Sequence, residues 1–209
     1  GKREFEAGFA VGCHVQPGTF YWLAGLSSAG GAVEWLRNLT ESGIPYEQVN
    51  SMLNSLGSNP GDILFLPYLA GSGTPHSEPA VRGALVGLRA THRMPDLLKA
   101  VLEGTAYEIE FARRRAEALL GVKINQIVAT GGGTRIPRWM QIRADVCGWP
   151  IQVAQTAEAG TLEGMEALLG ASAQSLRPRH RRLAAGPRLR RQRHLGRRRR
   201  HAPRRRRVD

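Results

Sequence analysis

The sequence has little cysteine, no long hydrophobic run and no leader-like start. Its two cysteines, Cys13 and Cys147, lie far apart and outside any CxxC pattern, so neither a disulfide framework nor a zinc site is predicted. We expect both to be ordinary buried thiols. No apolar run approaches the roughly 20 residues that span a bilayer, and the first residues lack the basic-then-apolar order of a signal peptide. These absences predict a soluble, cytoplasmic protein.

Positive charge is abundant, but it is confined to the C-terminal end. The net charge is +13, yet residues 171–209 hold 16 arginines and one acid, Asp209, so this end carries +15 and leaves −2 for the rest. It contains no isoleucine, aromatic residue, methionine or lysine. Such a segment cannot close a hydrophobic core, so we expect residues 172–209 to form a disordered Arg-rich tail.

Residues 1–171 have the pattern of an α/β domain. The segment from Leu69 to Arg82 is rich in Gly, Pro, Ser and Thr and is predicted to be a loop. Helices are predicted over Ala29–Leu39, Glu47–Leu56, Pro95–Leu119 and Gly160–Leu169, and strands over Asp62–Leu66, Val122–Ala129 and Pro150–Ala154. The alternation after Gly121 predicts a layer with a mainly parallel sheet, in which ligands bind beyond the C-terminal strand ends.

A triple glycine follows one of these strands directly. Gly131, Gly132 and Gly133 have no Cβ, so the backbone can approach a phosphate or a purine, and the next helix would present unsatisfied N–H groups. A tight strand-to-helix turn without a ligand explains the pattern equally well. The motif is not a Walker A sequence, and it is not GxGxxG because Ile136 stands at the place of the third glycine.

Three segments, in the family's order along the chain, resemble the FGGY family of carbohydrate kinases. FLPYLAGSGTPHSEPAVRGA at Phe65–Ala84 resembles a family loop, the run from Gly83 to Glu103 resembles the family's C-terminal signature, and ATGGGTR at Ala129–Arg135 resembles its nucleotide-binding turn. The resemblance extends from about Cys13 to about Ala171, and PYLAGSGTPH favours a xylulose kinase-like member. It implies the second, C-terminal domain of a two-domain protein with the actin-like, ribonuclease-H-like ATPase fold.

The resemblance also implies where ATP would bind. Gly132 matches a glycine that contacts the nucleotide, and Ile136 occupies a position where some relatives have a polar contact. Gly30 matches a glycine beside the phosphates, and Glu34 matches a position that is glutamine in glycerol kinases. The implied cofactor-binding set is Gly30, Glu34, Gly131, Gly132, Gly133 and Ile136.

The implied reaction is transfer of the γ-phosphoryl group of ATP to a sugar hydroxyl, with Mg²⁺ and an aspartate acting as base. In the family, that aspartate and most of the sugar pocket lie in the first domain. We therefore assign no catalytic residue and no metal ligand here, and we expect the chain alone to be inactive. His76, without an acid partner, and Glu103 are expected to have structural roles. A homodimer is compatible with this interpretation.

The Arg-rich tail leaves other interpretations open. It could be a frameshift product, which is favoured because the arginine excess begins where the family resemblance stops. It could be a localisation signal, or a functional arm that binds nucleic acid or an anionic surface through phosphate contacts. In the last case the chain would be a basic binding protein. A third alternative is an inactive remnant whose exposed apolar face prevents stable folding.

Overall fold

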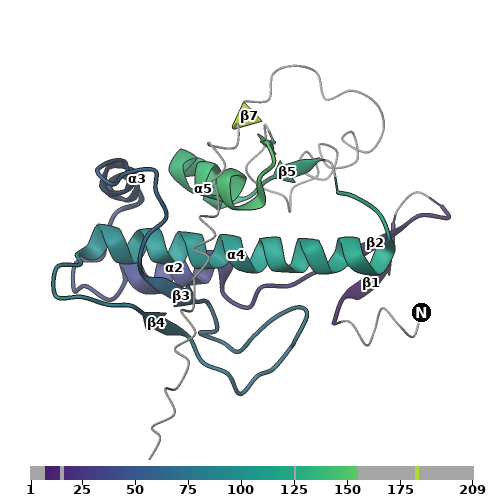
Figure 1. Cartoon of the computed structure of the whole chain (residues 1–209), viewed down its shortest axis with the longest axis horizontal. Coiled ribbons are helices and arrows are strands. Elements are labelled where there is room, and N and C mark those ends of the chain that lie inside the picture. The colour runs from purple at the N-terminus through teal and green to yellow at the C-terminus, as the bar shows by residue number, and fades with distance from the viewer. Residues whose placement is uncertain (1–7, 15–16, 125, 155–181, 184–209) are drawn as a thin grey trace, which may run out of the picture.

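The computed structural model of the chain describes residues 8–14, 17–124, 126–154 and 182–183. A long helix, α4, runs through the centre, and the other elements are arranged around it (Figure 1). The helices are α2 (Ala29–Arg37), α3 (Tyr46–Asn54), α4 (Met94–Leu120), the 3₁₀ helix η1 (Gly132–Arg135) and α5 (Pro137–Cys147). The strands are β1 (Ala10–Cys13), β2 (Phe20–Leu23), β3 (Leu64–Leu66), β4 (Ala84–Val86), β5 (Ile127–Ala129), β6 (Ile151–Val153) and β7 (Arg182–Leu183).

Local signals at both ends define α4. Pro95 lies in the first turn, where its missing N–H costs no helical hydrogen bond, and the Asp96 carboxylate accepts a 2.8 Å bond from the Arg93 backbone N–H. Gly121 ends the helix with φ of +66°, a conformation that glycine adopts without strain. The predicted start of the helix is confirmed.

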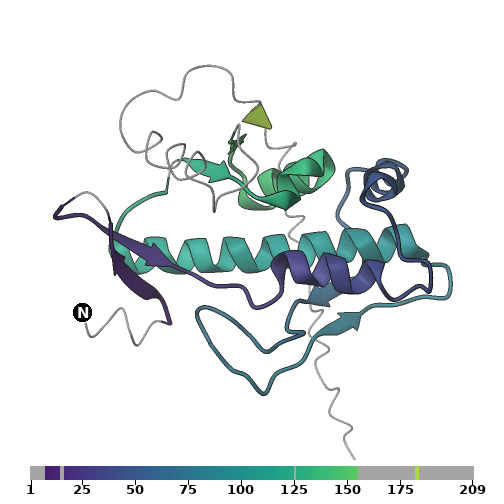
Figure 2. The same ribbon diagram turned by 180° about the vertical axis from the view of Figure 1, so that it is seen from behind.

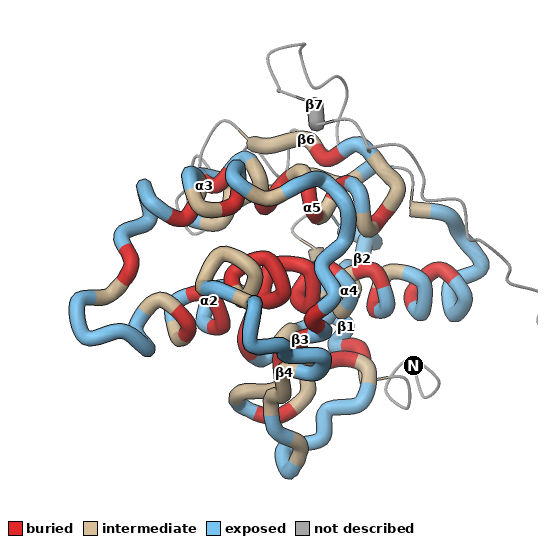
Figure 3. Tube along the Cα trace, turned by 60° about the vertical axis from the view of Figure 1, so that its left-hand side comes forward, coloured by how far each residue is buried: buried red, intermediate tan, exposed pale blue. Residues whose placement is uncertain are grey.

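One hydrophobic core joins four helices to β3. In α4 every residue from Leu98 to Ala106 is buried, whereas burial is intermittent toward the C-terminal end (red in Figure 3), and Phe65 of β3 lies against the buried part. At Gly104 an added Cβ would lie 2.4 Å from the carbonyl oxygen of Phe65, so helix and strand are packed as closely as a glycine permits. Trp35 of α2 stacks on the Phe65 ring at 6.2 Å between centroids, so this tryptophan packs against the core.

The parallel pairing expected after Gly121 is confirmed for its two predicted strands, and antiparallel ladders occur elsewhere among the described residues. β5 and β6 are parallel, but β1 pairs with β2 and β3 with β4 as separate antiparallel ladders. β3 is also shorter than predicted, and Leu64 is exposed while Phe65 is buried. The sequence pattern after Gly121 correctly predicted strands that alternate with helices. The antiparallel pairs consist of very short strands, and the sequence pattern does not show how these pair.

Three further expectations meet the structure differently. Cys147 is buried as expected, but Cys13 is exposed, because its edge of the β1–β2 hairpin faces outward. Within the expected tail, Arg182 and Leu183 form β7, which pairs antiparallel with β6. The other residues of 172–209, and the helix predicted over Gly160–Leu169, lie outside the described residues. Among the described helices, none is long and apolar enough to cross a membrane.

Candidate functional site

The triple glycine forms a tight turn between β5 and α5. Gly131 has φ of +95°, and its carbonyl oxygen accepts hydrogen bonds from both the backbone N–H and the hydroxyl of Thr134, at 3.0 and 2.7 Å. The chain then makes the short helix η1 and enters α5 at Pro137. A 3₁₀ turn thus separates the glycines from the next helix, and Pro137 contributes no N–H to the start of that helix.

The residues of this turn face different surroundings. Gly132 is exposed, and a Cβ added there would meet no atom within 4 Å. A Cβ added at Gly133 would lie 2.8 Å from the Trp139 ring. Ile136, with only 2% of its surface exposed, belongs to the hydrophobic core. The side chain of Ile136 is thus turned inward, whereas the backbone at Gly132 is open to solvent.

The second segment of the implied set is the start of α2. Gly30 lies in the first turn of this helix, is exposed and has no atom within 4 Å of an added Cβ. Thr74 anchors the preceding loop, since its hydroxyl accepts a 3.1 Å bond from the Gly25 N–H and donates a 3.0 Å bond to the Gly8 carbonyl. Beside it, His76 stacks on Phe111 at 5.8 Å, a packing contact in keeping with the structural role expected for this loop.

Glu34 lies on the exposed face of α2 and is held by neighbouring side chains. Its carboxylate accepts hydrogen bonds from Tyr46 at 2.9 Å, Asn38 at 3.1 Å and Arg37 at 2.6 Å. The bond from Tyr46 is the largest cause that lowers the pKa of Glu34, followed by the bond from Asn38. This acid is ionised and engaged in a surface cluster with Arg37 and Asn38 at the end of α2 and with Tyr46 of α3.

The two segments lie on the same half of α4. Figures 1 and 2 show α2 and α5 alongside the N-terminal half of this long helix. Both contribute to one core cluster, through Ala32 and Val33 of α2 and through Trp139 and Met140 of α5. Gly30 is thereby carried on a helix whose opposite face is buried, and Gly132 lies on η1 immediately before α5.

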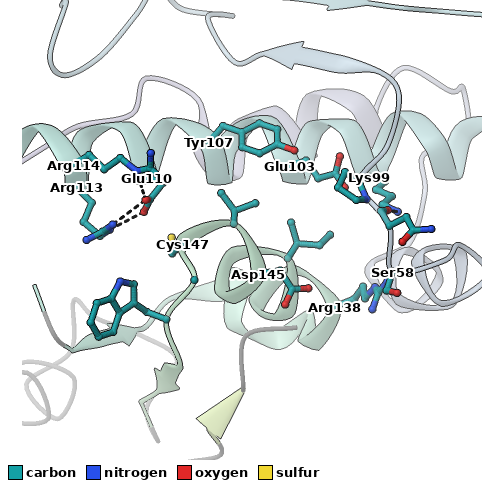
Figure 4. Close-up of a pocket in the computed structure, with 16 residues that line it drawn as sticks. Ser58, Lys99, Glu103, Tyr107, Glu110, Arg113, Arg114, Arg138, Asp145 and Cys147 are labelled. Carbon is teal, nitrogen blue, oxygen red and sulfur yellow. Dashed lines mark hydrogen bonds and ion pairs between the residues drawn. The ribbon is translucent and has the colours of Figure 1, made fainter. Parts of the chain in front are cut away.

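A cavity of about 800 Å³ lies between α4, α5 and the loop before β3 (Figure 4). None of the six implied nucleotide contacts lines it. Lys99, on its wall, donates to the carbonyl oxygens of Gly57 and Asn59, and Arg138 donates to Gly57 at 3.1 Å. Because these cations already serve to hold the loop, the cavity does not present them to a ligand.

Glu103 is the acid of the family-like signature, and it also holds this loop. Both of its carboxylate oxygens accept from the backbone N–H of Gly61, at 3.1 and 3.0 Å. Burial is the largest influence and raises the pKa of Glu103, while the Gly61 bond and the charge of Lys99 act in the opposite direction. Glu103 is thus paired with a backbone amide, a contact in keeping with the structural role expected for it.

A charged network on α4, which the sequence analysis did not predict, joins Arg113 and Arg114 to two acids of the same helix. Arg113 binds Glu110 at 2.7 and 2.8 Å and Glu117 at 2.6 Å, and its side chain is only 12% exposed. Burial acts to raise the pKa of Glu110, but the hydrogen bonds from Arg113 and Arg114 outweigh burial and lower the pKa. The spacing of Glu110, Arg113 and Glu117 by three and four residues was the available signal.

No three His, Cys, Asp or Glu side chains gather in a metal-binding arrangement within residues 8–14, 17–124, 126–154 and 182–183. The glycine turn, by contrast, suits a nucleotide, because the open backbone at Gly132 offers room that a side chain would fill.

Comparison with solved structures places this arrangement among sugar kinases. A xyloylose kinase from Brucella ovis superposes with a TM-score of 0.74 and 27% identity, over 87% of this chain and 38% of that one. A Plasmodium falciparum glycerol kinase with ADP shares the fold, with a TM-score of 0.64 and 20% identity, over 81% of this chain and 35% of that one. The chain thus has the actin-like, ribonuclease-H-like α/β fold of these ATPases.

Sequence comparison identifies the family. The model of the FGGY family of carbohydrate kinases, C-terminal domain, matches residues 2–173, so the chain belongs to this family. The xylulose kinase of Staphylococcus xylosus is 32% identical over 151 residues, which are 72% of this chain and 31% of that protein. The xylulose kinase of Escherichia coli is 30% identical over 153 residues, 73% of this chain and 31% of that protein. The chain thus spans less than a third of the length of these relatives.

Proposed function

We propose that this chain is the nucleotide-binding half of an ATP-dependent sugar kinase that phosphorylates a pentulose such as xylulose. The observation that carries the proposal is the open backbone of Gly132, at the C-terminal end of the parallel strand β5, in a chain of the FGGY family. Ligands of such sheets bind beyond the carboxyl ends of the strands. The relatives named xylulose kinase favour a pentulose as the acceptor.

The chain's own residues would bind and orient the nucleotide. Gly131 turns the backbone at φ of +95°, and the Thr134 bonds to its carbonyl oxygen fix the turn before a ligand arrives. Gly30, exposed at the start of α2, would approach the phosphates near the N–H groups of that helix end. ATP supplies the transferable phosphoryl group. A turn that is already fixed binds the nucleotide more tightly than a mobile turn, because less conformational entropy is lost on binding.

The remaining groups of the reaction lie, by resemblance, in the other domain. The aspartate base, most of the sugar pocket and the ligands of Mg²⁺ belong to that domain or to its contact with this one. We therefore expect the chain alone to bind ATP without turning over sugar. Release of ADP that depends on added xylulose, measured in a coupled assay with the purified chain, would contradict this.

The assignment of the turn is tested by calorimetric titration with ATP. Gly132→Val places a branched side chain at the open backbone and should abolish binding. Gly57→Val is the matched control, because Gly57 is equally exposed, has no atom within 4 Å of an added Cβ and lies outside the turn. The titrations are run at about 0.3 M salt, which screens attraction of phosphate to exposed arginines. Equal ATP affinity of the two variants would refute the assignment.

A second candidate function is supported by the charge of +15 on residues 171–209. Through these arginines the chain would bind nucleic acid or another anionic surface, with affinity that falls steeply as salt rises. A chain that ends at Ala184 keeps β7 and loses most of the arginines. If it still binds ATP but no longer retains single-stranded DNA in a gel-shift titration, the two functions belong to separate parts.

A further inference from the structure

The three glycines of the turn are needed for three different reasons. At Gly131 the reason is conformation, because φ of +95° is strained for any residue with a Cβ. At Gly133 it is space, since an added Cβ would lie 2.8, 3.1 and 3.4 Å from three atoms of the Trp139 ring. At Gly132 neither reason applies, because no atom lies within 4 Å and no positive φ is required. Only Gly132 is left free for a ligand.

Trp139 is itself held firmly beneath the turn. Its side chain is 3% exposed, and the guanidinium carbon of Arg143 lies over the ring, 4.4 Å from the centroid. Among the described residues, the indole Nε1 is buried without a hydrogen-bond partner. The ring therefore keeps its position through packing and the cation–π contact, and not through a hydrogen bond.

We infer that Trp139 is a positioning residue for the nucleotide. Its indole fixes the place of Gly133, and thereby directs the adjacent open backbone of Gly132 toward the phosphates or purine of ATP. The turn has a closed side, formed by this ring, and an open side that receives the ligand. This inference rests on the proposed function, since it says which glycine of the turn meets the nucleotide and what keeps it there.

A double-mutant cycle on the full chain tests the inference through ATP affinity. Gly133→Ala forces its methyl group into the indole and displaces the turn, so we expect ATP binding to weaken about tenfold. Trp139→Ala weakens binding as well, because the turn loses its support. In the Trp139→Ala background the ring is gone, so adding Gly133→Ala should cost little further affinity. Gly57→Ala is the control, because Gly57 lies outside the turn with no atom within 4 Å of an added Cβ, so this change should leave ATP affinity unaltered with or without the indole.

The Tm of each variant without ATP shows whether a loss of ATP affinity comes from a displaced turn or from a destabilised fold. We expect Gly132→Ala to leave the ligand-free Tm within about 2 °C of the natural chain. Trp139→Phe keeps a ring in place and should retain more ATP affinity than Trp139→Ala. If Gly133→Ala does not fold, this graded series still decides the matter. Equal ATP affinity of the natural chain, Trp139→Phe and Trp139→Ala would overturn the inference.

The remaining outcomes are also decisive. If Gly133→Ala weakens ATP binding by the same factor in both backgrounds, the indole does not act through Gly133, and the inference is wrong. If the unmodified chain shows no ATP binding, the proposed function fails and this inference fails with it. ATP binding by the unmodified chain without coupling between Gly133 and Trp139 overturns only the inference.

Discussion

Replacing Gly104 by alanine tests the closest contact in the core. This glycine lies in the middle of α4, where the helix crosses β3, and an added Cβ would lie 2.4 Å from the carbonyl oxygen of Phe65 and 3.1 Å from its Cβ. Carbon and carbonyl oxygen normally approach no closer than about 3.3 Å. The helix and the strand must therefore separate by roughly 1 Å, because both contacting parts belong to the backbone or its first side-chain atom.

Two opposing effects set the size of the change. Alanine is the better helix former by about 1 kcal/mol, which alone would stabilise α4. Overpacking a core typically costs about 1–3 kcal/mol, and a rigid backbone partner places this site at the upper end. We therefore expect a net loss of about 2 kcal/mol in the free energy of unfolding, or a fall in Tm of roughly 4–8 °C.

Thermal and urea unfolding followed by circular dichroism at 222 nm measure this loss. Gly31→Ala is the matched control, because Gly31 is a helical glycine in α2 with no atom within 4 Å of an added Cβ. That variant should be as stable as the natural chain or slightly more so. If Gly104→Ala is equally stable, then the close approach of α4 to β3 does not exist in solution, and the arrangement of the core described above is wrong.

Three further predictions concern single groups. Burial raises the pKa of the Cys147 thiol to about 11, so at pH 8 only about one in a thousand is thiolate; a thiol-reactive dye should label exposed Cys13 rapidly, and Cys13→Ser should leave only slow labelling. Burial also raises the pKa of Glu103 above 4.5. The free energy of unfolding of the natural chain, measured with urea, should therefore fall relative to that of Glu103→Gln as the pH rises above 4.5. Thr74→Val leaves two backbone partners of the hydroxyl unpaired and should lower the unfolding free energy by about 1–3 kcal/mol, measured by urea unfolding.

Helices were predictable because their signals are local and repeated. In α4 the proline and acid of the first turn, the stripe of apolar residues and the final Gly121 all lie within one stretch of sequence. The helices expected over Ala29–Leu39 and Glu47–Leu56 exist, although each ends about two residues early. Their ends fray because the last carbonyl groups have no helical partner, and sequence patterns do not resolve that.

Strand pairing and charge pairing were less predictable because they join residues far apart. Nothing in Leu64–Leu66 indicates that its partner is Ala84–Val86, since the register depends on how the whole loop between them folds. The burial of Arg113 depends likewise on two acids and on the approach of α5. The spacing of Glu110, Arg113 and Glu117 indicated the ion pairs, but it gave no sign that they would be buried.

The glycine turn shows most clearly what the sequence could and could not supply. Three glycines after a strand indicate that the backbone closely approaches another group, but they do not identify that group. The family resemblance implied a nucleotide as the neighbour of all three residues. The structure distinguishes Gly133, which meets the Trp139 ring, from Gly132, which meets nothing within 4 Å. That ring arrives from the following helix, and its position follows from core packing. A glycine that is needed for packing and a glycine that is free to bind are therefore identical letters in the sequence, and only the surrounding atoms separate them.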